Sequence, residues 1–226
     1  MTDFPRLQSA EAIAALVNEI GFLPFFENHI PGFSIEEHTP PERWFSDTLD
    51  GPWEWKGPII RQSGGAYGKF FMNKAGFISR DWFYDFANYR RDGYDFDARY
   101  DDGLAGHRDL LLIQALEELG PSLSRTLKRH AGFGGKDGIK GFDTVITRLQ
   151  MQCYAVTADF EYMTDKLGKP YGWGVCRYAT PEQLYGAAFG DTAYRREPRE
   201  SYRRIFEHLK ALLPHASDAA IRRLLG

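Results

Sequence analysis

The stretch GFDTVITRLQMQCYAVTADFEY, residues 141–162, changes its hydrophobic period near the middle. Four apolar residues in its first half recur at the spacing of one helical face: Phe142, Val145, Ile146 and Leu149. From residue 154 onward, apolar and polar residues alternate, as they do in a strand with one buried face. After a polar turn, residues 171–177 form a second run in which side-chain character alternates. The stretch therefore predicts a helix over residues 141–150 that leads into a β-hairpin.

The same pattern extends toward the N-terminus of this stretch. Apolar spacing predicts a helix over residues 107–119, which Gly-Pro ends, and a second helix from Ser122 or Ser124 to His130. Three helices followed by a hairpin form the order of a winged helix, a helix-turn-helix relative that usually binds nucleic acid. We therefore expect a winged-helix module over residues 107–182.

The flanking regions give weaker patterns. Residues 1–106 are rich in aromatic rings, and the proline-rich part predicts few regular elements. The expected elements are a helix over 10–20, loops and short turns over 21–58, a strand over 66–71, a helix over 80–88, a polar loop over 90–106, and C-terminal helices over 200–213 and from 217 onward. We expect the N-terminal region 1–106 and the C-terminal helices of 183–226 to pack on one core with the module. The predicted fold class is α+β and mostly helical, with a loop-rich N-terminal half.

The composition limits the possible classes of protein. The chain has 226 residues, of which 43% are hydrophobic and 26% are charged, and this balance excludes a disordered chain. The polar N-terminus predicts no signal peptide, and no apolar run is long enough to span a membrane. Cys153 and Cys176 lack the spacing of a metal site or a disulfide framework. We therefore expect a cytoplasmic protein without a metal or a cofactor.

Polar side chains of the predicted winged helix form a candidate DNA-binding face. They are Arg125, Lys128, Arg129, Lys140, Thr144, Thr147, Arg148, Lys166 and Lys169. Residues 107–178 hold ten Lys and Arg against eight Asp and Glu, whereas the whole chain has a net charge of -3. Such cations neutralise phosphates, so double-stranded DNA is the expected partner. The alternatives are an ordinary solvated helix face or a protein-docking surface, and the sequence leaves the oligomeric state open.

Three tryptophans form a candidate pocket in the N-terminal half: Trp44, Trp53 and Trp55. Aromatic rings stack on a flipped base, and Glu54 offers a carboxylate beside them. The alternative is that these rings are the core of a loop-rich segment. The sequence does not decide between the two.

Several runs resemble one bacterial family. LQMQ at 149–152, DFE at 159–161, YGWGV at 171–175 and YATPE at 178–182 resemble proteins described as AlkZ-related, distant relatives of the AlkZ/YcaQ DNA glycosylases. GFLP at 21–24 and FANYRRDGYD at 86–95 look similar to the same group, so this resemblance covers nearly the whole chain. The resemblance to true glycosylases is confined to the winged-helix region.

This resemblance implies candidate catalytic residues. Glycosylases of that family use Gln-x-Gln or Gln-x-Asp to position water and stabilise the sugar cation, and Gln150 and Gln152 match these letters. In the family the motif lies in the first winged helix, near the N-terminus, whereas here it ends the third predicted helix. The alternative is structural, with Gln150 at a helix end and Gln152 at a strand edge.

Three functions remain open from the sequence. The first is a DNA-binding, glycosylase-like protein that acts on damaged bases, which as an enzyme would hydrolyse N-glycosidic bonds. The second is a non-enzymatic winged-helix regulator or protein-interaction module with a small-molecule pocket in its N-terminal half. The third is a protein that kept only the fold and has a different active site in the N-terminal half.

Overall fold

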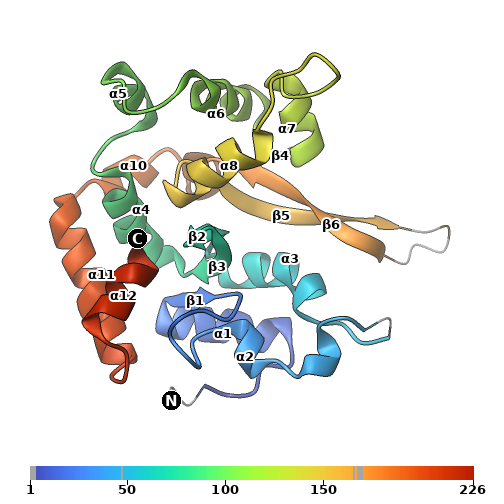
Figure 1. The fold of residues 1–226 in the computed structure, drawn as a ribbon, viewed down its shortest axis with the longest axis vertical. Coiled ribbons are helices and arrows are strands. Elements are labelled where there is room, and N and C mark those ends of the chain that lie inside the picture. Colours follow the sequence, from blue (N-terminus) through green and yellow to red (C-terminus); the bar gives the residue numbers. More distant parts are fainter. Residues whose placement is uncertain (1–3, 47, 165, 167–169) are drawn as a thin grey trace.

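A computed structural model describes residues 4–46, 48–164, 166 and 170–226. Within these residues, six strands form one antiparallel sheet in the order β1-β3-β2-β5-β6-β4, and helices surround it (Figure 1). The expected mixture of helices and strands is therefore confirmed. No helix in this described part is long and apolar enough to cross a membrane.

The N-terminal region holds more regular structure than its sequence predicts. Its elements are α1 (Ala10–Ile20), β1 (Phe22–Pro24), α2 (Ile35–His38), the 3-10 helix η1 (Pro41–Arg43), α3 (Pro52–Ser63), β2 (Ala66–Phe71), β3 (Lys74–Ile78), α4 (Arg80–Arg91) and α5 (Phe96–Asp101). The predictions for 10–20 and 66–71 are confirmed. The predicted helix over 80–88 continues for another turn, to Arg91.

Two predictions of loop structure in this region are wrong. Helix α3 forms although Pro58 lies inside it. An internal proline costs about 3 kcal/mol, but burying each large side chain contributes about 1.5–3 kcal/mol. Trp55 and Ile59 are among the residues that α3 buries. Helix α5 interrupts the predicted polar loop because Asp95 caps it, accepting a hydrogen bond of 2.8 Å from the Ala98 amide, and Phe96 is buried.

The central region contains the three predicted helices and the predicted hairpin, together with a short strand, β4, that the sequence does not predict. These elements are α6 (His107–Leu119), β4 (Ser122–Leu123), α7 (Ser124–His130), α8 (Phe142–Met151), β5 (Val156–Thr164) and β6 (Pro170–Ala179). The second predicted helix begins at Ser124, because Ser122 lies in β4 and pairs with Tyr178 of β6. β5 and β6 pair along their length and project from the body of the molecule (Figure 1).

The C-terminal region is helical. Its elements are α9 (Pro181–Tyr185), α10 (Phe189–Ala193), α11 (Pro198–Leu212) and α12 (Asp218–Leu225). Helix α11 packs against α4, and α12 packs against α11. The Ser217 hydroxyl caps α12 as predicted, accepting a hydrogen bond of 3.1 Å from the Ala220 amide.

Two apolar clusters stabilise the described part of the chain. The larger cluster joins residues of α1, α3, α4 and β1–β3 to residues of α11 and α12. The smaller cluster lies among α6, α7 and α8, and it includes Phe96 and Tyr178. The larger cluster also contains Val156 and Phe160 of β5, so the hairpin contributes side chains to both clusters.

Candidate nucleic-acid interface and the buried arginine behind it

Helix α8 presents a polar face away from the core. Its apolar stripe, which includes Val145 and Ile146, is buried in the smaller cluster. Thr144 is exposed and Thr147 is half-buried, as expected for the face opposite this stripe. Asp143, also exposed, adds a negative charge in the first turn of the helix. Helix α8 itself carries one acidic and one basic residue, Asp143 and Arg148, so its polar face offers hydroxyl groups but no net positive charge.

Arg148 has a partner within the protein. Its Nε and Nη2 atoms both donate to Oδ1 of Asp109, at 3.0 and 2.6 Å. The Asp109 side chain is only 5% exposed, and its other oxygen accepts the Gly106 amide at the start of α6. The pair connects α8 to α6, and only its Asp109 end is buried, because the Arg148 side chain is 43% exposed. Removing Arg148 would leave the buried Asp109 charge without its partner. Reading a base with Arg148 would require breaking the pair.

The other cations of the predicted face are free to meet solvent. Arg125, Lys128 and Arg129 of α7 are exposed, and Lys140 is exposed just before α8. Lys166 is exposed at the hairpin turn, and Lys169 lies outside the described residues. Helices α7 and α8 lie above the β5–β6 hairpin in Figure 1.

Gln150 is a buried bridge between α8 and the sheet. Gln150 is only 2% exposed. Its Oε1 atom accepts a hydrogen bond of 3.2 Å from the Lys69 amide of β2, and its Nε2 atom donates to the Ile146 carbonyl at 3.2 Å. Gln152, which is half-buried, follows as the C-cap of α8. The two glutamines therefore differ in environment, and only Gln152 meets solvent.

We expect Gln150→Leu to lower the free energy of unfolding by about 1–3 kcal/mol, because the Lys69 amide and the Ile146 carbonyl lose their hydrogen-bond partner in the buried Gln150 side chain. Urea unfolding followed by circular dichroism measures this loss. Gln152→Leu is the matched control and should change the free energy of unfolding by less than about 0.5 kcal/mol. Equal effects of the two substitutions would contradict the structural role assigned to Gln150.

Helix α8 ends in a turn that directs one carbonyl inward. Cys153 has a φ of 61°, a left-handed backbone conformation that residues other than glycine rarely adopt. The Tyr154 amide then donates to the Leu149 carbonyl at 2.9 Å, which satisfies the end of the helix. The Cys153 carbonyl is left to accept hydrogen bonds from another element.

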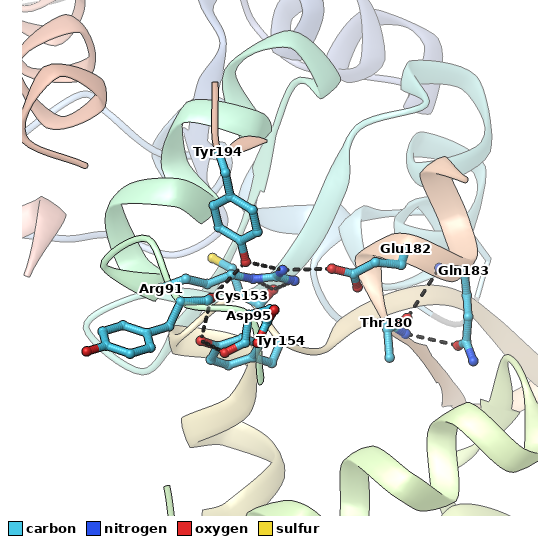
Figure 2. Close-up of polar contacts among 9 residues, drawn as sticks. Arg91, Asp95, Cys153, Tyr154, Thr180, Glu182, Gln183 and Tyr194 are labelled. Carbon is cyan, nitrogen blue, oxygen red and sulfur yellow. Dashed lines mark hydrogen bonds and ion pairs between the residues drawn. The ribbon is translucent and has the colours of Figure 1, made fainter. Parts of the chain in front are cut away.

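That element is α4, which supplies the fully buried Arg91. The Arg91 side chain is 1% exposed, and its Nη2 and Nε atoms donate to the Cys153 carbonyl at 2.8 and 3.2 Å. Its Nη1 atom donates to Glu182 Oε1 at 2.7 Å and to the Tyr194 hydroxyl at 2.9 Å (Figure 2). Burial lowers the pKa of Arg91, but Glu182 and Tyr194 outweigh that effect and the pKa is raised. The guanidinium therefore stays charged.

Two aromatic contacts and a backbone carbonyl complete the Arg91 cluster. The guanidinium carbon lies 4.6 Å from the centre of the Tyr154 ring and 5.3 Å from that of Phe189. The Tyr194 and Tyr154 hydroxyls both donate to the Tyr94 carbonyl, at 2.7 and 2.9 Å. Arg91 thus links α4, the end of α8, the α9–α10 segment and the chain that enters α5.

The Cys153 thiol in this cluster is deeply buried, and burial raises its pKa to about 12. We expect Ellman's reagent at pH 8 to leave Cys153 unmodified in a folded Cys176→Ser variant and to modify it in urea. The pKa of Cys153 in the folded protein lies above the unfolded value of about 8.5. The buried neutral thiol therefore makes its full contribution to the free energy of unfolding below about pH 8.5, and this contribution is lost as the pH rises toward 12. Rapid labelling of the folded variant would contradict this burial.

Of the three candidate pocket tryptophans, Trp44 and Trp53 lie among other aromatic rings, and the Arg43 guanidinium lies over the Trp55 ring. Trp44 and Trp55 are 8% and 7% exposed. The Trp44 and Trp53 rings are 5.9 Å apart, and each lies within 6.5 Å of the rings of Phe25 and Phe26. Cavities of about 520, 700, 510 and 380 Å³ among the described residues are lined by residues other than these tryptophans. The arrangement is that of a packed core with the rings already in contact.

The Arg91 cluster is a feature that the sequence alone did not reveal. A signal was present, because Arg91 lies four residues after Ala87 and eight after Phe83, on the buried stripe of α4. A charged residue on an apolar stripe requires a partner. The partners, Glu182 and Tyr194, are 91 and 103 positions away, and no local pattern identifies them.

A comparison with protein families supports one assignment. The family model described as AlkZ related matches residues 7–226, and this range includes α8, the hairpin and the Arg91 cluster. No curated protein and no solved structure matches the chain. Because the family model covers nearly the entire chain, the protein belongs to the AlkZ-related family.

Proposed function

We propose that the protein binds double-stranded DNA through a winged helix formed by α6, β4, α7, α8 and the β5–β6 hairpin. The observation that carries the proposal is the pairing of β4 with β6, Ser122 with Tyr178 and Leu123 with Arg177. A short strand between the first two helices that pairs with the last strand of the hairpin fits a winged helix. In this interpretation α8 is the recognition helix and the hairpin is the wing.

The proposed contacts follow from exposure and charge. Arg125, Lys128 and Arg129 would neutralise phosphates, with Lys140 and Lys166 at the two ends of the face. Thr144, Thr147 and Arg148 of α8 would face the major groove, with Arg148 leaving Asp109 on binding. Lys169 remains a proposed contact on the basis of sequence alone. Because Arg148 must leave Asp109 before it can contact a base, we expect the protein to show a weak preference for DNA sequence.

Membership of the AlkZ-related family supports a role in DNA repair, because the family name relates it to DNA-repair glycosylases. We infer that the duplexes bound include damaged ones. Both amide atoms of Gln150 are engaged within the protein, so Gln152 is the glutamine able to approach a sugar. Base release from alkylated duplex DNA tests for N-glycosidic hydrolysis. Release that persists in Gln152→Ala would remove this residue from the mechanism.

A second candidate function is a ligand-responsive, non-enzymatic regulator. Its support is a cavity of about 520 Å³ between the N-terminal loop and the C-terminal helices, which lies within the usual size range of ligand pockets. Ile30 and Leu213 give it apolar walls, and His29 and His215 give it polar groups. A thermal-shift screen of a small-molecule library tests this function. Compounds that stabilise the wild-type protein but fail to bind an Ile30→Trp variant, in which the larger side chain fills the cavity, would support it.

Fluorescence anisotropy with a labelled duplex tests the principal proposal. We expect binding at about 50 mM salt that weakens strongly at about 200 mM, because binding to phosphates releases counterions. A duplex that fails to bind at the lower salt concentration would contradict the proposal. Binding that does not change with salt would contradict the proposed phosphate contacts.

A further inference from the structure

A separate cavity of about 510 Å³ lies between the C-terminal end of α4 and the α11–α12 pair. It is lined by Tyr89 and Asp92 at the end of α4, by Pro198, Arg199 and Tyr202 of α11, and by Arg222 and Gly226 at the end of α12. Its volume is within the range typical of small-ligand sites. The lining therefore combines two phenol rings with two guanidinium groups.

The rings belong to a group of contacting aromatic side chains, called the aromatic platform below, in which the Tyr89 plane is tilted 49° from that of Tyr202. The Tyr89 and Tyr202 ring centres are 5.0 Å apart, and Tyr202 stacks on Phe206 at 6.0 Å with 27° between the planes. The Arg222 guanidinium lies over the Phe206 ring at 5.2 Å. The Tyr89 hydroxyl donates to the Gly226 carbonyl at 2.6 Å, which fixes the orientation of the ring. The platform is thus ordered by contacts within the protein.

The C-terminal segment that forms α11 and α12 carries an excess of positive charge, and two of its arginines, Arg199 and Arg222, line this cavity. Residues 195–226 hold eight Lys and Arg against four Asp and Glu, in a chain whose net charge is -3. This local excess of four is larger than the excess of two over residues 107–178. Arg199 and Arg222 are exposed, and neither forms an ion pair with any other residue that the structure describes. Two guanidinium groups are therefore available to an anionic ligand.

We propose that this cavity binds unpaired nucleotides of a single-stranded nucleic acid. A base would stack against the Tyr202 ring, with the tilted Tyr89 ring beside it, and the neighbouring phosphates would pair with Arg199 and Arg222. Stacking on aromatic rings together with guanidinium–phosphate pairing is the usual chemistry of single-strand binding. The site lies apart from α7 and α8, and the proposal does not depend on duplex binding there.

Two oligonucleotides of equal length separate base stacking from simple charge attraction. The wild-type protein is titrated by anisotropy with a short oligothymidine and with an abasic oligomer that has the same phosphates. We expect the oligothymidine to bind about tenfold more tightly, because stacking one base contributes about 1–3 kcal/mol. Equal affinity for the two oligomers would overturn the proposal. So would competition by polyglutamate as effective as competition by unlabelled oligothymidine, since this would indicate an acidic peptide as the ligand.

A matched pair of arginine variants locates the site. Arg199→Ala removes a cation of this cavity, whereas Arg195→Ala removes an equally exposed arginine that lines a different cavity beside Trp82. We expect Arg199→Ala to weaken oligothymidine binding about three- to tenfold at low salt and Arg195→Ala to leave it unchanged. Tyr202→Leu should abolish the preference over the abasic oligomer. Equal effects of the two arginine substitutions would place the binding elsewhere and overturn the proposal.

Discussion

Replacing Arg91 with methionine is expected to lower the free energy of unfolding by about 3 kcal/mol, a larger loss than we expect from replacing Gln150. Removing one partner of a buried ion pair typically costs about 3–5 kcal/mol, because the remaining polar groups stay buried without partners. The lower end applies because the Glu182 side chain is 41% exposed and can turn to water. The Cys153 carbonyl has no such escape, since Cys153 is fully buried.

Urea unfolding of the two proteins measures this loss. Arg80→Met is the matched control, because Arg80 is an exposed arginine in the first turn of the same helix. Its expected effect is below about 0.5 kcal/mol. Arg91→Lys should lie between the two, since an ammonium group keeps the charge but not the planar set of donors. An Arg91→Met protein as stable as the wild type would contradict the role given to the Arg91 cluster.

Loss of the α7 cations is the second large effect that we expect. In a variant with Arg125→Ala, Lys128→Ala and Arg129→Ala, duplex affinity at low salt should fall by about 10- to 100-fold. Three fewer phosphate contacts should also reduce the slope of log affinity against log salt by about 2–3. All three residues are exposed, so their removal should leave the fold intact. Anisotropy titrations over a range of salt concentrations give both quantities.

A variant with the same loss of charge elsewhere controls for long-range electrostatic attraction. Arg6, Lys74 and Arg80 are exposed cations that precede α1, begin β3 and begin α4. Replacing all three with alanine should leave the slope near that of the wild type. If both triple variants lose affinity equally, net charge rather than the α7–α8 face controls binding.

The central elements could be predicted because their signals are local. The change from a helical to an alternating pattern after Leu149 locates α8 and β5 to within two residues. The pairing of β4 with β6 was not predicted, because a strand of two residues is too short to leave a periodic pattern. For this reason the sequence offers Ser122, which lies in β4, beside Ser124 as a possible start of the second helix.

The candidate site could be predicted only in part, because burial depends on contacts between distant residues. The position of Thr144 on the polar face of α8 follows from spacing alone. The pairing of Arg148 with Asp109 joins residues 39 positions apart, and the Lys69 amide lies 81 positions from Gln150. Neither partner is marked by composition or period. Helix α3 was missed for a related reason, since tertiary burial outweighs the local cost of Pro58.

Amide hydrogen exchange of the wild-type protein, with and without a saturating duplex, tests the central claim most directly. If α7 and α8 hold the DNA, exchange should slow upon binding in residues 124–151, with smaller changes in α1 and α11. Slower exchange confined to α11 and α12, with none in residues 124–151, would contradict the proposed winged-helix interface.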